Sequence, residues 1–175
     1  MTGSLHSAAD NDRRPRRSPG PRLRRLLGSP GLLYDWRLGW LLGHRFLRLT
    51  HIGRRSGQRH QTVLEVVGRN RAEREFIVVA GLGRSAQWYR NLQVHEGVEV
   101  AIGRERFVPI HRELPIPEAE GVLAAYERRN RWIAPIIHGA LSWLVGWRYD
   151  GTEAARRRLV AELPLIGFRP ARSES

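Results

Sequence analysis

The stretch Leu49–Thr62, which reads LTHIGRRSGQRHQT, most strongly limits the folds open to this chain. An apolar run, Phe46–Ile52, enters it, and an alternating run, His60–Val67, leaves it. Between them, in Gly53–Gly57, two glycines enclose two arginines and a serine. Glycine permits positive φ angles and a close approach of the backbone. We therefore predict a β-hairpin whose turn presents amides, guanidiniums and a hydroxyl to a phosphate or carboxylate. The simpler interpretation is a solvated hairpin tip.

Further short elements separated by turns follow this hairpin. We expect more strands at Glu75–Gly81, Val98–Ile102, Arg106–Arg112 and Leu165–Phe168, with a polar turn at Gly68–Arg74. The run EFIVVAG is almost continuously apolar, so we expect it to be buried on both faces. Six short, mostly antiparallel strands predict a small barrel.

Helices are expected at four places between and after these strands. One begins with Ser85 as its N-cap and reaches Val94, and the others span Pro115–Arg129, Arg131–Trp147 and Thr152–Leu163. A second glycine turn, Gly81–Gly83, runs into the first of these helices. Free amides and the helix dipole at that end favour an anion.

The ends of the chain differ in composition from its middle. Residues 1–30 are rich in Arg, Pro, Ser and Gly, which indicates a disordered leader that is either solvated or in contact with nucleic acid or acidic headgroups. We expect a single domain over residues 31–170 and a disordered tail at 171–175. Within the domain, Gly31–Leu47 keeps a helical period. It is interpreted either as an interfacial helix at a membrane or as a helix packed across the barrel.

Composition excludes several classes of chemistry. The chain of 175 residues has no cysteine, which excludes disulfides, thiolate metal sites and thiol nucleophiles. All 30 basic residues are arginine, which excludes lysine Schiff bases and a P-loop lysine. The formal charge of +13 favours an anionic partner, namely nucleic acid, acidic lipid or a polyanionic small molecule.

The remaining polar residues show no familiar catalytic arrangement. The histidines lack metal-ligand spacing, although His51 and His60 are expected to meet across the hairpin. No carboxylate pair and no nucleophile-elbow motif occurs. Glu65 is expected to point into the barrel, where Arg54, Arg55 or Arg59 would be its partner. Anion-binding turns without acid–base groups are typical of enzymes in which a cofactor performs the chemistry.

Four segments in order, LTHIGRRSG, QTVLEVV, VVAGLGRSAQWYRNL and VEVAIGRERFVPI, resemble the deazaflavin-dependent nitroreductase family. The match covers about Leu41 to Arg112, and ELPLIGFRP is similar to the family's closing strand. The resemblance implies an α+β fold, a split β-barrel of the FMN-binding split-barrel type with about six strands. It also implies an F-420-dependent oxidoreductase of the actinobacterial kind.

The same resemblance implies a set of cofactor-binding residues. The phosphate and polyglutamate tail of F-420 would lie at the first turn, two residues of the next strand would face the cofactor, and the second turn and its helix would pass the deazaflavin ring. These residues are Arg54, Arg55, Ser56, Gly57, His60, Thr62, Leu64, Ala80, Gly81, Leu82, Gly83, Arg84, Trp88 and Asn91.

Three positions depart from the family pattern. His60 stands where arginine is common, Val63 where proline is common, and Leu82 where lysine is frequent. No catalytic side chain and no metal ligand is assigned. Tyr126 and Tyr149 are candidates for the substrate side by residue type alone.

The resemblance therefore predicts an F-420H2-dependent reductase that delivers hydride to a quinone, nitro or enone-type acceptor. FMN is the less favoured cofactor. The alternatives are a non-catalytic deazaflavin- or flavin-binding module and a basic nucleic-acid-binding protein, although no helix-turn-helix, zinc or RNP pattern occurs. The expected partners are a small-molecule acceptor and a second copy in a homodimer, with no specific nucleic acid. The expected location is the cytoplasm, with peripheral contact at the inner face of the cell membrane as the further option.

Overall fold

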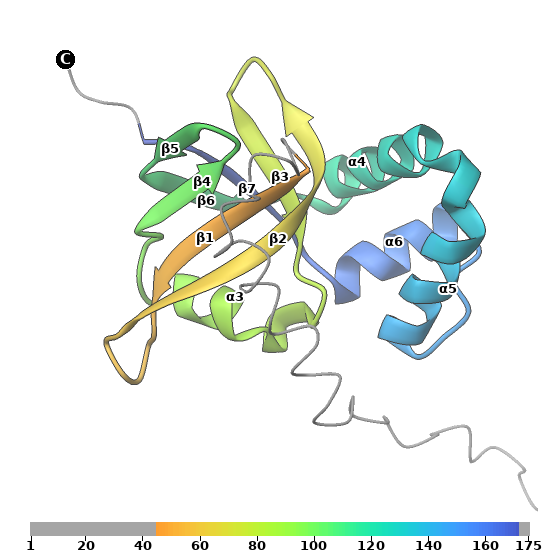
Figure 1. Cartoon of the computed structure of the whole chain (residues 1–175). Coiled ribbons are helices and arrows are strands. Elements are labelled where there is room, and N and C mark those ends of the chain that lie inside the picture. Colours follow the sequence, from red (N-terminus) through yellow and green to blue (C-terminus); the bar gives the residue numbers. More distant parts are fainter. Residues whose placement is uncertain (1–44, 172–175) are drawn as a thin grey trace, which may run out of the picture.

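Seven antiparallel strands form one sheet in the computed structural model, which describes residues 45–171 (Figure 1). The strands are β1 (Phe46–Ile52), β2 (Arg59–Asn70), β3 (Glu75–Val79), β4 (Glu99–Ile102), β5 (Glu105–Phe107), β6 (Pro109–Glu113) and β7 (Leu165–Pro170). Their order across the sheet is β5-β4-β1-β2-β3-β7-β6. The leader, residues 31–44 of the predicted helical segment and residues 172–175 lie outside the part of the chain described here. The end of that helical segment, Phe46 and Leu47, belongs to β1.

The sheet curls into a nearly closed barrel. β5 and β6 lie at opposite ends of the strand order, yet a single residue, Val108, joins them in the chain. The two edges of the sheet must therefore meet at this residue. The backbone nitrogen of Ala171, just past β7, donates a hydrogen bond to the Val108 carbonyl at 3.0 Å, which extends the β6–β7 ladder to this junction. The α+β split-barrel-like fold expected from the resemblance is confirmed.

The prediction of one strand at Arg106–Arg112 is wrong. The segment forms two strands, because β5 pairs with β4 whereas β6 pairs with β7. Pro109 lies at the change of partner and has no N–H with which to continue the first ladder. The barrel therefore has seven strands within residues 45–171 rather than six.

β2 is longer than the sequence suggested. The expected polar turn at Gly68–Arg74 begins only after Asn70, and β2 carries a register shift between Val66 and Gly68. A Cβ atom on Gly68 would lie 2.6 Å from the Cγ1 atom of Val122. Glycine here permits the close approach of a helix to the strand rather than forming a turn.

Four helices lie beside the barrel in the described part of the chain. They are α3 (Gln87–Leu92), α4 (Ile116–Arg129), α5 (Ala134–Val145) and α6 (Glu153–Glu162), with short 3-10 turns η2 (Gly83–Ser85) and η3 (Arg131–Ile133). In Figure 1, α3 crosses one end of the barrel, and α4, α5 and α6 lie together on one side. The last three agree with the predicted helices, and the Thr152 hydroxyl caps α6 by accepting from Ala155 N at 3.2 Å.

The predicted N-cap at Ser85 is wrong. Its hydroxyl donates to the Leu82 carbonyl at 2.6 Å, and α3 begins only at Gln87 and ends at Leu92. Competition of this kind between a serine side chain and the local backbone favours a tight turn over a helix start. The turn therefore delays the start of the helix by one residue, and Ala86 takes the N-cap position.

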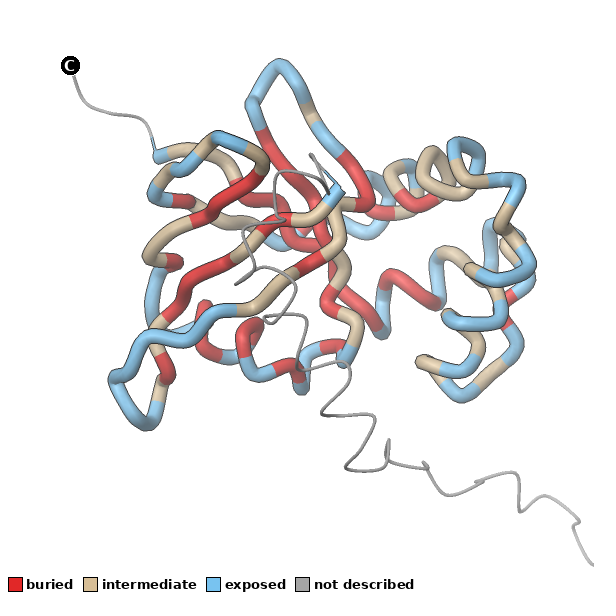
Figure 2. The backbone as a smooth tube through the Cα atoms, in the orientation of Figure 1, coloured by how far each residue is buried: buried red, intermediate tan, exposed pale blue. Residues whose placement is uncertain are grey.

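Two clusters of apolar side chains make the core. One fills the barrel and includes Leu47, Leu49, Leu64, Phe76 and Val78, together with Trp88, Tyr89 and Leu92 of α3. The other lies between the barrel and α4, α5 and α6. β3 supplies Phe76 and Val78 to the first cluster and Ile77 to the second, which confirms its predicted burial on both faces. Buried residues line the strands in Figure 2.

A charged group is also buried beside this core. Glu75, at the start of β3, is 1% exposed. Its carboxylate accepts two hydrogen bonds from Arg112 of β6, both 2.7 Å long. Arg112 also donates to Glu118 of α4 at 2.8 and 2.6 Å. These hydrogen bonds raise the pKa of Arg112, and they link β3, β6 and α4.

Candidate anion-binding site

The β1–β2 hairpin forms as the glycine pattern predicts. β1 and β2 pair in register from Phe46–Glu65 to Ile52–Arg59, with His51 opposite His60. Gly57 has a φ angle of 67°, a left-handed conformation that glycine adopts without strain. The nitrogen of Gly57 donates to the Gly53 carbonyl, and that of Gly53 donates to the Gln58 carbonyl, each at 2.8 Å. The predicted meeting of His51 and His60 is confirmed, because their rings stack with centroids 5.8 Å apart.

The turn amides are less available than the sequence suggested. The nitrogens of Gly53 and Gly57 are satisfied within the turn, and that of Arg54 donates to the side-chain oxygen of Asn91 at 3.1 Å. The Ser56 hydroxyl accepts from Gln58 N at 3.3 Å. The capacity of this turn to bind an anion therefore depends mainly on its arginine side chains.

Helix α3 holds the turn in place through a buried amide. Asn91 is 4% exposed, and its Oδ1 atom accepts from both the backbone and the Nη1 atom of Arg54, the latter at 3.0 Å. Nη1 also donates to Oε1 of Gln87 at 2.9 Å. Because both acceptors are neutral, the guanidinium is oriented while its charge stays uncompensated.

The nitrogen of the same Asn91 amide determines which tautomer the neutral His51 ring adopts. Asn91 Nδ2 can only donate, so His51 Nδ1 accepts this hydrogen bond at 3.0 Å. The proton of the neutral ring then resides on Nε2, which donates to the Thr62 hydroxyl at 3.3 Å. Burial lowers the pKa of His51, and the neighbouring His60 lowers it further. Both effects favour the neutral ring.

Positive charge is concentrated at this end of the barrel. The pKa of Arg54 is lowered by desolvation and then by repulsion from Arg90 and Arg55. Across residues 45–171, no carboxylate forms an ion pair with these three arginines. We call Arg54, Arg55 and Arg90 the arginine cluster. Guanidiniums that repel one another and have no carboxylate partner favour an anion beside them.

Arg90 was not among the residues predicted from the sequence. It lies in α3, immediately before Asn91 in the segment WYRNL, and the side chains of adjacent helical residues point in different directions. Asn91 points into the barrel, and Arg90 is exposed. Considering the two as adjacent residues that point to different sides of one helix could have identified Arg90.

The second glycine turn has a different environment. Ala80 is fully buried, and its nitrogen donates to the Pro164 carbonyl at 3.0 Å. Gly83 is buried so close to α6 that a Cβ atom on it would lie 2.8 Å from the Glu162 carbonyl oxygen. A Cβ atom on Gly81 would lie 3.8 Å from Leu144 of α5, whereas Leu82 is 48% exposed. Most of this turn therefore packs against the helices.

Arg84 differs from the arginine cluster because its charge is matched. It donates to Glu113 at 2.5 and 3.1 Å and to the Tyr89 hydroxyl at 2.7 Å. The hydrogen bond to Glu113 is the main reason that the pKa of Arg84 is raised. Tyr89 OH donates in turn to Glu113 at 2.7 Å, which completes a closed network.

Thr62, Leu64 and Trp88 lie on the barrel side of their elements. Leu64 is 8% exposed and Trp88 is 7% exposed, and both belong to the barrel core. His60 is exposed, with Nε2 3.4 Å from the Ser56 hydroxyl. The structure thus gathers the residues of the first turn with His60, Thr62 and Asn91, whereas Ala80 and Gly83 are buried against other elements.

The opposite face of β2 borders a cavity that sequence reasoning missed. The cavity has a volume of about 530 Å³ and is lined by Thr50, Arg59, Gln61, Val98, Glu99, Arg106, Phe107 and Val108. The period-two pattern of β2 places Arg59 and Gln61 on this face, away from Thr62 and Leu64. That alternation is the sequence signal that could have indicated the cavity.

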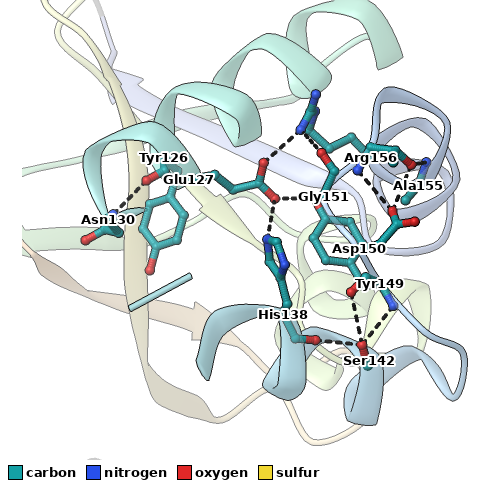
Figure 3. Close-up of polar contacts among 11 residues, drawn as sticks. Tyr126, Glu127, Asn130, His138, Ser142, Tyr149, Asp150, Gly151, Ala155 and Arg156 are labelled. Atoms are coloured by element: carbon teal, nitrogen blue, oxygen red, sulfur yellow. Dashed lines mark hydrogen bonds and ion pairs between the residues drawn. The ribbon is translucent and has the colours of Figure 1, made fainter. Parts of the chain in front are cut away.

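Two further predictions about side chains need correction. Glu65 accepts from the Tyr126 hydroxyl at 2.9 Å and pairs with Arg45 at 3.3 Å, rather than with an arginine of the first turn. Tyr149 is 2% exposed, and its hydroxyl donates to Glu127 among the helices, as drawn in Figure 3. Tyr149 is therefore enclosed by protein and has no surface with which to face a substrate.

Comparison with known proteins identifies a protein family that matches this chain. A family model described as F420H(2)-dependent quinone reductase matches residues 37–132, more than half of the chain. A search of curated protein sequences found no match.

Similar solved structures share little sequence with this chain. They include the protein Atu2129 of unknown function from Agrobacterium tumefaciens str. C58, at 13% identity over 82% of this chain and 55% of that one, with a TM-score of 0.48. An F420-H2 dependent reductase, FDR-A, matches at 17% identity over 73% of this chain and 96% of its own, with a TM-score of 0.39. A structure described as a domain-swapped dimer matches at 16% identity over 81% and 100%, with a TM-score of 0.40. This chain spans about half the length of Atu2129.

Proposed function

Because the chain belongs to the family of F-420H2-dependent quinone reductases, we propose that it binds reduced F-420 and transfers its hydride to a quinone, nitro or enone-type acceptor. The structural observation that carries this proposal is the arginine cluster. It gathers three guanidiniums without a carboxylate partner among the described residues. The ligand expected there has several negative charges, as the phosphate and glutamate tail of F-420 has.

The residues fit such a ligand in their chemistry. Arg54 is held by Asn91 and Gln87 through neutral oxygens, so its orientation is set before any ligand arrives. Preorganisation of this kind reduces the ordering cost of binding. Arg55 and Ser56 are exposed at the tip of the turn and complete the donors available to an anion.

Each part of the site has a separate role in the proposal. When bound, F-420H2 supplies the hydride, and the chain orients and shields it. The arginine cluster holds the anionic end. Gly81 and Leu82, the accessible part of the second turn, would lie beside the deazaflavin ring when the cofactor is bound. No side chain is assigned a proton-transfer step.

A turnover assay tests this function. Purified protein is mixed without oxygen with reduced F-420 and menadione, and the appearance of oxidised F-420 is followed by its absorbance. We expect catalysed oxidation that falls at least about tenfold in kcat/KM for Arg54→Ala/Arg55→Ala. Arg104→Ala, which removes an exposed arginine from the β4–β5 turn, is the matched control and should keep its activity.

The possible outcomes separate the functions considered. Binding of F-420 without turnover of menadione, a nitroarene or an enone would indicate a non-catalytic module. Turnover with FMN in place of F-420 would agree with the fold but would indicate a flavin-dependent reductase. Absence of binding to either cofactor would contradict the proposal.

A further inference from the structure

The outward face of α5 is apolar and exposed. No residue of this helix is buried, and in Figure 2 its tube has no red segment. Its inner side packs Leu141, Leu144 and Val145 against the second core cluster. On the outer side, Trp132 of η3, Ile136 and Trp143 are 78%, 71% and 54% exposed. The spacing of seven residues places Ile136 and Trp143 on one face of α5, and Trp132 is exposed in the turn that leads into the helix. We call these three residues the α5 patch.

This face also lacks charge. The helix sequence APIIHGALSWLV contains one ionisable side chain, His138. His138 lies on the inner side, where its Nε2 is 3.8 Å from Glu127 and its ring packs edge-on against Tyr149 (Figure 3). A solvated helix normally carries charged residues on its outer face, as α6 does with Arg157 and Arg158.

Arginines lie at both ends of the α5 patch. Arg128 and Arg131 precede the helix and Arg148 follows it, and all three are exposed. In the described part of the chain none of them forms an ion pair with a carboxylate. The result is an apolar stripe with tryptophans near its ends and cations beyond them.

We propose that the α5 patch docks on the surface of an anionic lipid bilayer. Tryptophan is favoured at the boundary between headgroups and acyl chains, and arginine is favoured beside lipid phosphates. A helix of this composition lies in the plane of the interface with its apolar face inserted. No helix within residues 45–171 is long and apolar enough to cross a bilayer. The inference does not depend on the proposed function, because no residue of the α5 patch belongs to the candidate site.

A bilayer fits this surface better than a second copy of the chain does. Two copies that met through the α5 patch would bring their flanking arginines together, and like charges at an interface oppose association. Anionic headgroups would instead neutralise them. The formal charge of the whole chain, +13, acts in the same direction.

Vesicle sedimentation tests the proposal. The full-length protein is mixed with sucrose-loaded vesicles of phosphatidylcholine and phosphatidylglycerol in equal amounts, in about 0.5 M NaCl to screen binding that depends on charge alone. We expect Trp132→Ser/Ile136→Ser/Trp143→Ser to lower the partition coefficient at least about tenfold. The matched control, Val94→Ser/Ile116→Ser, removes exposed apolar residues elsewhere and should bind like the wild type.

A second measurement covers the case in which the triple variant is unstable. Lipids brominated in their acyl chains should quench the tryptophan fluorescence of the wild-type protein. Trp143→Phe, a mild change at an exposed site, should reduce the quenched fraction.

Four results would overturn the proposal. One is equal vesicle binding by the wild type and the triple variant, and another is no binding by the wild type. The third is a change from dimer to monomer in the triple variant with unchanged vesicle binding, which would assign this face to a second copy. The fourth is vesicle binding by the triple variant that is lost when residues 31–44 are deleted. This result would assign the binding to that segment of the chain instead of the α5 patch.

Discussion

The Oδ1 atom of Asn91 lies 3.1 Å from the backbone nitrogen of Arg54 and 3.0 Å from its Nη1 atom. The same side chain donates from Nδ2 to His51 at 3.0 Å. One buried amide therefore joins α3, β1 and the hairpin turn, and it orients the central arginine of the candidate site. This relationship makes Asn91 a positioning residue for Arg54.

Two substitutions of Asn91 should distinguish the effect of its hydrogen bonds on stability from the effect of the Arg54 charge on binding. Asn91→Ala leaves the partners on Arg54 and His51 unsatisfied and should lower the free energy of unfolding by about 1–3 kcal/mol, measured by urea denaturation. Asn91→Asp keeps an acceptor for Arg54 but places a carboxylate beside its guanidinium. We expect this variant to lose more affinity for F-420 than Asn91→Ala does. The reverse order would show that the position of Arg54 matters more than its uncompensated charge, and it would contradict the role assigned to that charge.

Acid should weaken the hairpin through His51. Burial and then His60 lower the pKa of His51 below its ordinary value of about 6.5, so the unfolded chain binds the proton more readily. The contribution of His51 to stability is therefore complete above pH 6.5 or so and is lost as the pH falls through the lowered pKa.

Thermal unfolding midpoints measured from neutral pH down to about pH 5 test this dependence. The decrease should be smaller in His51→Gln than in the wild type. His111→Gln is the comparison variant, because burial also lowers the pKa of His111. An unchanged decrease in His51→Gln would show that His51 is not an important source of the acid sensitivity.

The ion pair of Glu75 and Arg112 should matter more than exposed pairs do. Arg112→Met leaves a carboxylate that is 1% exposed without its cation, and it should destabilise the protein by about 3 kcal/mol. This is the low end for a broken buried pair, because the Arg112 side chain is 38% exposed. Arg112→Met/Glu75→Gln should recover much of the loss.

The matched control for this pair is Arg169→Met. Arg169 forms an ion pair with Glu73 at 2.9 Å, and both side chains are substantially exposed. Its removal should cost less than about 1 kcal/mol in urea denaturation. Equal effects of the two methionine variants would contradict the importance assigned to burial.

Two glycines that look alike in the sequence should respond in opposite ways to alanine. Gly68→Ala places a methyl group 2.6 Å from the Cγ1 atom of Val122 and should destabilise the protein by about 1–3 kcal/mol. Gly121→Ala lies within α4 with open space around it and should stabilise by about 0.5–1 kcal/mol. Differential scanning calorimetry of the two variants measures both signs, and a stabilising Gly68→Ala would contradict the close packing of α4 on β2.

Local patterns in the sequence predicted much of this fold. β1 appears at Phe46–Ile52 as expected, and the Thr152 cap and the burial of β3 on both faces agree with their residue types. These features depend on neighbours in the chain. The change of partner at Pro109 could not be predicted in the same way, because it depends on where the two edges of the barrel meet.

The candidate site was predictable only in part for a similar reason. The glycine and arginine spacing indicated the first turn, and the turn forms with Gly57 in the left-handed conformation. The matched charge of Arg84 could not be read from its own segment, because its partner Glu113 comes 29 residues later. The role of Arg90 depends in turn on how α3 lies against the hairpin.

The most direct test of the account is a titration of the protein with oxidised F-420, followed by the quenching of intrinsic fluorescence. Arg54→Ala, Arg55→Ala and Arg90→Ala are compared with the wild type and with Arg104→Ala. We expect saturable quenching by F-420, a dissociation constant raised at least about tenfold in each cluster variant, and no change in Arg104→Ala. Equal affinity in all five proteins would show that the arginine cluster does not hold the cofactor, and it would contradict the account.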